Sequence, residues 1–279
     1  MSFDVASLPE SLSKLECCVK DIQNWMTSNL LCLNADKTEF LLLTPRNSNT
    51  NLENITIQVG NENIKTTPLA KNIGVFFDKH FLLHEQVTHV ARSAWYALRR
   101  IGQIRPFLNQ TAAERVIHAF ISSRLDQNYS LLHGISDCHM KKLRRVQYAS
   151  DEVLLRQHPM GSMSPILSQL HWLSISQRVE YKILLLVYKC LNGYAPAYLA
   201  ELIKLKDSTR HLRSNSQCML ETPKSGQKMP KVTYGDRSFT MVAPRLWNVL
   251  PPSVKLQPSI DSFKVALKTH LFKCAFLNI

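Results

Sequence analysis

The apolar positions of the first 80 residues predict one helix followed by a small sheet. Early in the chain they recur every three to four residues, which is the spacing of one helix face, at Leu12, Leu15, Cys18, Val19, Ile22, Trp25 and Met26. Ser28-Asn29 ends this helix. Strands are predicted at residues 39–44, 55–59, 63–66 and 73–77, with Gly60-Asn61 as a hairpin turn. We therefore expect one helix and an antiparallel sheet.

After Phe81 the apolar spacing becomes helical almost throughout. A first long helix has one apolar face made of Leu83, Val87, Val90, Ala94, Leu98 and Ile101. A capping box at Thr111–Glu114 begins a helix towards Leu132, and Asp137 caps the next, which contains Met140, Leu143, Val146, Val153 and Leu154. Further helices are expected from Ser174 to Asn192-Gly193, from Pro196 to Leu205, and over residues 259–275, where Phe263, Leu267, Leu271 and Phe272 share one face.

This pattern predicts an α+β chain in four segments. Residues 1–80 form the helix and small sheet, and residues 81–206 form a helical bundle. Residues 207–235 are polar and contain Pro223, Gly226 and Pro230, which favours a linker or a long hairpin. Residues 236–279 form a C-terminal helical segment.

Charge is distributed unevenly between these segments. The chain has a net charge of +13, but residues 1–80 carry seven Lys/Arg and nine Asp/Glu, whereas the other 199 residues carry 27 and 12. Such a basic region is typical of a protein that binds a polyanion such as nucleic acid, although a solvated basic helical domain would have the same composition.

Several other classes of protein are disfavoured. The seven cysteines include no CxxC pair, so we expect reduced thiols and no zinc site. The longest apolar runs are far shorter than a membrane span, and the first residues lack the pattern of a secretory signal. We therefore expect an intracellular protein, nuclear or cytoplasmic, that makes no membrane contact.

Two short motifs carry a family resemblance. Leu33-Asn34-Ala35-Asp36-Lys37-Thr38-Glu39 and Lys71-Asn72-Ile73-Gly74-Val75 resemble two late palm motifs of the reverse transcriptases of non-LTR (LINE-type) retrotransposons. Similar segments follow in the order of that family's thumb and post-thumb regions, including Leu170–Leu173, Tyr188–Leu199, Ala243–Pro251 and Phe263–Phe272. The resemblance covers residues 8–276.

The resemblance implies roles for particular residues. Lys37 matches the palm lysine, and Asn72, Ile73, Gly74 and Val75 match the primer grip, a tight hairpin that presses its backbone against the primer end. Glycine allows such a close approach because it has no Cβ. The family's Mg²⁺ ions are held by an aspartate pair that would precede these motifs. No adjacent aspartates occur in this sequence. We therefore expect a truncated reverse transcriptase that holds no metal or other cofactor and does not polymerise by itself.

The sequence departs from the family pattern at two further places. Asp126-Gln127-Asn128-Tyr129 stands where the family has an Asp-Tyr-Cys-Asn string. Gln147-Tyr148-Ala149-Ser150-Asp151 replaces a Gln-Asn-Ala-Ala-Arg string and introduces an acidic group.

Candidate nucleic-acid-binding residues lie on two predicted helices. They are Arg92, Arg99 and Arg100, off the apolar face of the first, and Lys141, Lys142, Arg144 and Arg145 on the second, with Arg156 further along. Lys and Arg at such positions suit phosphate contacts that do not read sequence. The expected partner is RNA or an RNA–DNA duplex. A solvated helix face is the simpler interpretation of the same run.

Two other interpretations remain open, and a third is disfavoured. The chain could be a helical protein–protein interaction module with no role in nucleic-acid binding. It could complete an active site together with the missing N-terminal half of a reverse transcriptase. A hydrolase is disfavoured because Gly134-Ile135-Ser136-Asp137-Cys138 is not a complete GxSxG element. His84-Glu85 and His89 also do not match the HExxH spacing.

Overall fold

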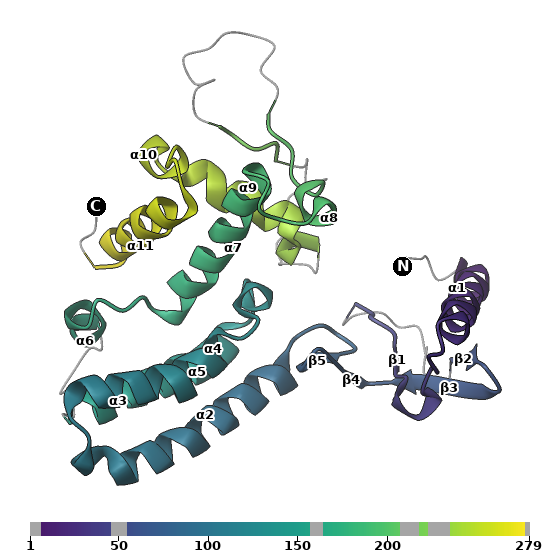
Figure 1. The fold of residues 1–279 in the computed structure, drawn as a ribbon, viewed down its shortest axis with the longest axis horizontal. Helices are drawn as coiled ribbons and strands as arrows, with labels where there is room; N and C mark the ends of the chain where they lie inside the picture. Colours follow the sequence, from purple (N-terminus) through teal and green to yellow (C-terminus); the bar gives the residue numbers. More distant parts are fainter. Residues whose placement is uncertain (1–6, 46–54, 157–163, 207–217, 223–234, 277–279) are drawn as a thin grey trace. The chain divides into compact units, whose positions relative to one another are not determined.

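A computed structural model describes residues 7–45, 55–156, 164–206, 218–222 and 235–276. The chain divides into two compact units, Met1–Gln86 and Val87–Ile279, so the observed boundary lies six residues after the one expected at residue 80. The first unit contains one helix and the strands, and the second is helical (Figure 1). The expected α+β class is confirmed.

In the first unit, helix α1 (Leu8–Ser28) covers one face of a three-stranded sheet. Its predicted apolar positions Leu12, Leu15 and Val19 pack against a buried cluster of Phe40, Ile57 and Val59. The helix ends at Ser28 as expected, because Leu30 takes left-handed backbone with φ of 59° and the Leu31 N–H donates to the Met26 carbonyl at 2.8 Å.

The sheet has the strand order β1-β3-β2. Strands β2 (Thr56–Val59) and β3 (Glu62–Thr67) form the expected antiparallel hairpin. Strand β1 (Phe40–Leu41) is shorter than the predicted 39–44 and pairs with β3 in parallel, which differs from the antiparallel arrangement expected. It is short because its neighbours bond elsewhere: the Glu39 carboxylate accepts from the Lys71 backbone N–H, and the Thr44 N–H donates to the Lys79 carbonyl.

A second hairpin, β4 (Leu69–Asn72) and β5 (Val75–Asp78), completes the first unit. The Asp78 carboxylate then accepts backbone N–H groups from His80, Leu82 and Leu83, at 3.1, 2.9 and 2.6 Å. These bonds fix the turn from which the next helix begins.

The second unit begins within helix α2 (His84–Ile104). Most of its predicted apolar face is buried, at Val87, Ala94, Leu98 and Ile101. Helices α3 (Gln110–Ile117) and α4 (Ser123–Asp126) are joined by a π-helical turn, His118–Ser122. The Asn109 side chain caps α3 by accepting the Ala112 N–H at 2.8 Å, so the predicted cap at Thr111 is wrong by two residues.

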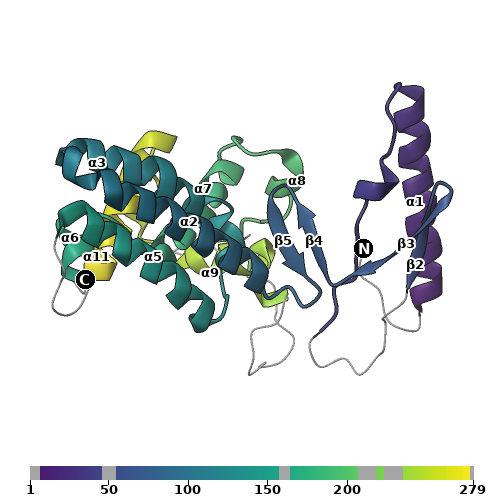
Figure 2. The same cartoon turned by 90° about the horizontal axis from the view of Figure 1, so that it is seen from below.

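Helix α5 (Asp137–Leu155) also begins at a different cap from the one predicted. Ser136 accepts the His139 N–H, while Asp137 lies in the first turn. Figures 1 and 2 show α2, α3 and α5 side by side. Helices α6 (Ser164–Gln169), α7 (Ile175–Leu191) and α8 (Ala197–Ala200) follow. The predicted cap of α7 is confirmed, since Gln177 Oε1 accepts the Ser174 N–H at 3.1 Å.

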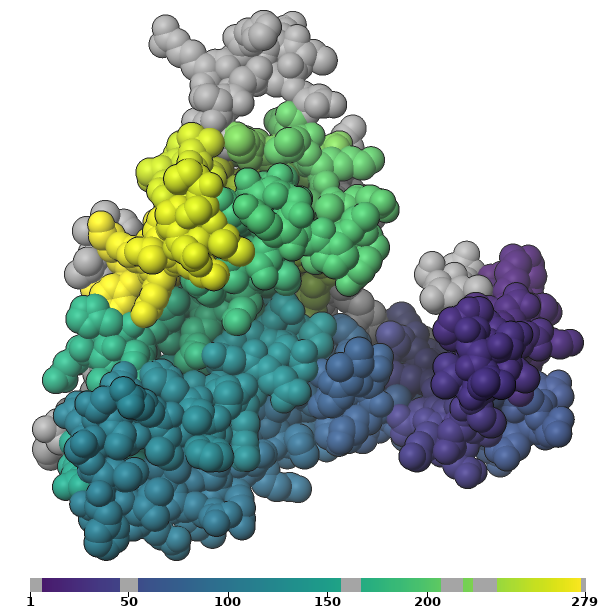
Figure 3. All heavy atoms as spheres, in the orientation of Figure 1, coloured from purple at the N-terminus to yellow at the C-terminus, as the bar shows by residue number. Residues whose placement is uncertain are grey.

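The C-terminal helices α9 (Phe239–Val249) and α11 (Ile260–Phe276) pack on α7, and the short helix α10 (Pro252–Lys255) packs on α11. Figure 3 shows the atoms of α11 (yellow) lying directly against those of α7 (green). The core there is aromatic: the Tyr188 and Phe263 rings are stacked at 4.1 Å, and Trp247 packs 6.0 Å from Phe263. The predicted face of the last helix is confirmed by buried Phe263, Leu267 and Leu271.

Most of the expected linker, residues 207–235, lies outside the described residues. Within it, Leu220 is buried and pairs with Leu205. The Asn248 side chain bonds both the Leu220 N–H and its carbonyl, at 2.8 and 2.9 Å. This short part of the segment is therefore packed on the helical unit.

Candidate nucleic-acid interface

Lys37 lies in a 3₁₀ turn, Ala35–Lys37, and its side chain is exposed. The Asn34 side chain accepts the Lys37 N–H at 3.1 Å, and the Thr38 hydroxyl donates to the Asn34 carbonyl at 2.8 Å. The motif is therefore a capped polar turn between helix and strand, as its polar residues predict. Its match to the palm lysine stays a prediction.

The expected tight hairpin at residues 72–75 is present. Asn72 pairs with Val75, and the two loop residues have φ of 47° at Ile73 and 79° at Gly74, the signature of a type I′ turn. The strand predicted at residues 73–77 therefore begins only at Val75. Ile73 is an unusual residue here, because β-branched side chains rarely adopt positive φ and its side chain is 89% exposed.

On α2 all three candidate arginines, Arg92, Arg99 and Arg100, are exposed. Arg92 and Arg99 line a cavity between α2 and α5, whereas the Arg100 guanidinium lies 5.9 Å from the ring centre of Tyr96. Arg100 is not among the residues that line this cavity. The three residues therefore do not form one cluster.

The basic residues on α5 also do not form one cluster. Lys141 and Arg145 are exposed and Lys142 is half-buried. Arg144 turns towards α7, where its guanidinium donates to Ser176 Oγ at 2.8 Å. Arg156 is also used internally, since it donates to the Arg105 carbonyl at 2.8 Å. Three of these five side chains therefore remain as candidates for ligand contact.

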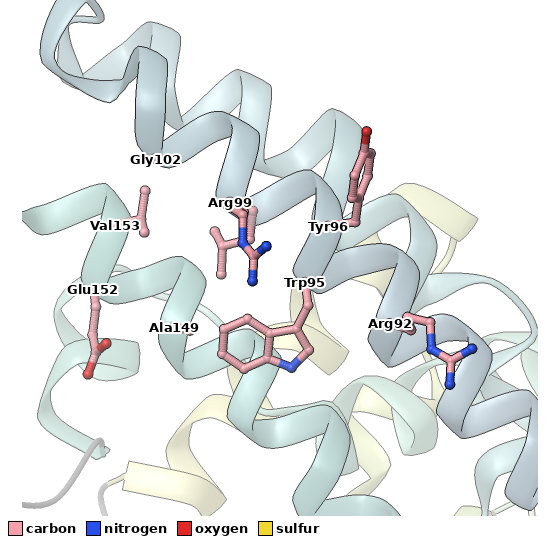
Figure 4. A pocket seen from close by; sticks show the side chains of 9 residues that line it. Arg92, Trp95, Tyr96, Arg99, Gly102, Ala149, Glu152 and Val153 are labelled. Atoms are coloured by element: carbon pink, nitrogen blue, oxygen red, sulfur yellow. The ribbon is translucent and has the colours of Figure 1, made fainter.

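The cavity between α2 and α5 has a volume of about 640 Å³. Figure 4 shows the Trp95 indole projecting into it from α2, between Arg92 and Arg99, with Ala149 and Val153 on the α5 side. Trp95 is 45% exposed. The sequence-based candidates do not include this residue, although an aromatic side chain between two arginines, off the apolar face, is a recognisable signal of a binding surface.

Arg105, just after α2, fixes the alignment of the two helices. Its guanidinium donates to the carbonyls of Val153, Leu154 and Leu108, at 3.0, 2.6 and 2.8 Å. Burial lowers the pKa of Arg105, yet guanidinium groups in proteins keep their charge. This buried arginine satisfies carbonyls at the end of α5, so it holds that end of the groove together.

A second cavity of about 470 Å³ lies between the α3–α4 helix and α7. Arg178 and Asp126 form an ion pair of 2.5 Å on its wall. His118, in the π-helical turn, lies 3.7 Å from the Glu114 carboxylate and 3.2 Å from Ser122 Oγ. Because acidic and basic side chains alternate around this cavity, it favours no single class of charged ligand.

Neither a metal site nor a membrane span is found in the described part of the chain. No three His, Cys, Asp or Glu side chains there are grouped so that they could hold an ion. None of the described helices is long and apolar enough to cross a membrane.

Comparison with known proteins identifies no family. No family model, curated protein or solved structure matches the chain.

Proposed function

We propose that the helical unit binds RNA or an RNA–DNA duplex through sequence-tolerant phosphate contacts. The observation that carries this proposal is the pair of exposed arginines, Arg92 and Arg99, on the wall of the α2–α5 cavity. The excess of 27 Lys/Arg over 12 Asp/Glu in residues 81–279 supports it. Cations on a groove wall attract a polyanion over a distance and hold it by its phosphates.

The basic side of α5 extends this wall. Lys142, Arg145 and Ala149 are separated by three and four residues, so they lie on one side of the helix, and Ala149 lines the cavity. The two helices run in the same direction, because Arg105 contacts the Leu154 carbonyl near the end of α5, while Trp95 and Ala149, which come earlier in α2 and α5, share the cavity.

Binding of the full chain to an RNA–DNA duplex across a salt series tests the proposal. Each phosphate contact contributes roughly 0.9 to the slope of log affinity against log salt, so four to five contacts give a slope of about −4. Flat or absent binding by a folded sample would overturn the proposal.

Arg144 and Arg145 provide a matched pair for the same assay. Arg145→Gln should weaken binding and reduce the salt slope by about 1, since an exposed phosphate contact is lost. Arg144→Gln makes the same change of charge but removes a bond to Ser176, so it should leave the slope unchanged. Equal effects of the two variants would mean that the protein attracts nucleic acid only through its overall charge.

We further propose that the first unit is a palm remnant, in which Lys37 and the β4–β5 hairpin correspond to late palm motifs. On this proposal, the chain does not polymerise alone, and an N-terminal half supplied as a separate polypeptide would bring the metal-binding aspartates. Primer extension by a mixture of the two chains with Mg²⁺ tests this proposal. A folded mixture that shows no extension would count against it.

A protein partner is the second candidate, and uncovered apolar surface favours it. Ile22, Trp25, Leu30 and Leu31 are all exposed at the end of α1, while the first half of that helix packs on the sheet. Association through such a surface changes little with salt, which separates it from phosphate binding. Trp25→Ala should weaken a partner's binding without affecting the nucleic-acid slope.

A further inference from the structure

Trp95 occupies an unusual position for a large aromatic side chain. It is 45% exposed, projects into the α2–α5 cavity, and has an arginine about one turn before it and another one turn after it (Figure 4). The small side chain of Ala149 lies opposite, and a Cβ added at Gly102 would meet no atom within 4 Å. The indole therefore faces open space in a groove with a cationic rim.

We propose that this groove binds an unpaired nucleobase of single-stranded RNA, stacked on Trp95. The inference rests on the proposed nucleic-acid function and specifies which form of the ligand the groove takes. Aromatic side chains stack on any base, so such a site tolerates sequence. A paired base has both faces covered by its neighbours, so a duplex can contact the two arginines but cannot stack a base on Trp95.

The charges around the cavity orient the strand. Arg92 and Arg99 are seven residues apart, or about 10 Å along the helix, so they contact different phosphates on either side of the stacked base. Glu152 is the carboxylate among the cavity-lining residues, and it lies on the α5 wall. The cationic side chains that line the cavity, Arg92 and Arg99, both belong to α2, so the backbone of the strand follows α2.

An acidic peptide is the competing occupant. It would pair with the same arginines, but a carboxylate side chain gains nothing from stacking on an indole. An RNA base uses both the ring and the cations, and the volume of about 640 Å³ lies in the range of pockets that enclose small ligands. The groove therefore fits a nucleotide better than a charged side chain.

The test measures binding of the full chain to a labelled single-stranded oligouridine and to a blunt RNA–DNA duplex at one salt concentration. Trp95→Ala should weaken single-strand binding by about 5- to 100-fold and leave duplex binding within twofold. Trp95→Phe, which keeps a stacking ring and guards against a folding defect, should retain most of the single-strand affinity. Tyr198→Ala removes an exposed ring on α8 and serves as the matched control.

The outcomes separate this inference from the proposed function. Salt-sensitive binding that is identical in the parent protein and Trp95→Ala would overturn base stacking while leaving phosphate binding intact. An equal loss on single strand and duplex would also overturn it. Binding of polyglutamate as tightly as oligouridine would assign the groove to an acidic partner. No binding to any nucleic acid would refute both proposals.

Discussion

Asp151 should make the protein less stable as the pH rises towards 8. Its side chain, on the buried face of α5, is fully buried, and neither carboxyl oxygen has a hydrogen-bond partner among the described residues. Burial raises the pKa of Asp151 from 3.8 to about 8; the nearby Arg178 guanidinium opposes this effect, and the Glu152 charge adds to it. The folded state therefore prefers the protonated carboxyl.

The sign and size of the effect follow from linkage. Between pH 4 and 8 the folded state holds a proton that the unfolded chain has lost, so the free energy of unfolding falls as pH rises through this window. Each pH unit corresponds to about 1.4 kcal/mol, which gives a ceiling of about 4 kcal/mol at pH 7. Asp151→Asn removes this titrating group. After about 1 kcal/mol is subtracted for a buried amide without a partner, the free energy of unfolding of the variant should exceed that of the parent protein by about 2–3 kcal/mol at pH 7.

Urea unfolding of the parent protein and Asp151→Asn, followed by circular dichroism from pH 5 to 8.5, measures this difference. Subtracting the two curves removes contributions common to both, such as that of His133, whose pKa burial lowers. The difference in free energy of unfolding between Asp151→Asn and the parent protein should grow as the pH rises. Asp137→Asn, an exposed change on the same helix, should shift stability by less than about 1 kcal/mol. A variant that is less stable than the parent at pH 8 would refute the argument.

Three further substitutions have predictable effects on stability. Ile73→Asn places a residue that accepts positive φ in the type I′ turn, so hydrogen exchange in the β4–β5 hairpin should slow by an amount equivalent to about 1 kcal/mol. Arg105→Lys loses the guanidinium group that bonds three carbonyls, so it should lower the free energy of unfolding in urea by about 2–3 kcal/mol. The control Arg115→Lys, at an exposed position, should lower it by less than about 0.5 kcal/mol. Tyr188→Phe loses one 2.8 Å bond to the Gln257 carbonyl and should lower the unfolding free energy by about 1 kcal/mol.

Periodicity predicted the helices well because their buried faces determine them. The face of α2 and the buried Phe263, Leu267 and Leu271 of α11 follow directly from apolar spacing. Helix starts were less predictable. The cap of α3 is Asn109, two residues before the predicted cap Thr111. Both side chains can accept a free backbone N–H, and only the path of the preceding chain selects between them.

Features that depend on distant contacts could not be read from the sequence. Parallel pairing of β1 with β3 depends on where the chain returns to the sheet. The sequence predicts a strand from residue 73, because isoleucine normally favours extended backbone, whereas Ile73 lies in the turn with positive φ. The sequence-based candidates do not include Trp95, because its place in the cavity depends on α5, which lies more than 50 residues later in the chain and forms the opposite wall.

The division of the basic run on α5 shows why clustered charges in a sequence overstate a binding surface. Successive helical residues point about 100° apart, so consecutive cations cannot all face one ligand. Arg144 points to Ser176 on α7, and Arg145 lies on the side of Ala149 and the cavity. Arg92 and Arg99 of α2 are seven residues apart and share that cavity instead. If the proposed phosphate binding is correct, it depends on the spacing of cations on two helices, and the salt slope should count those contacts alone rather than the total charge of the chain.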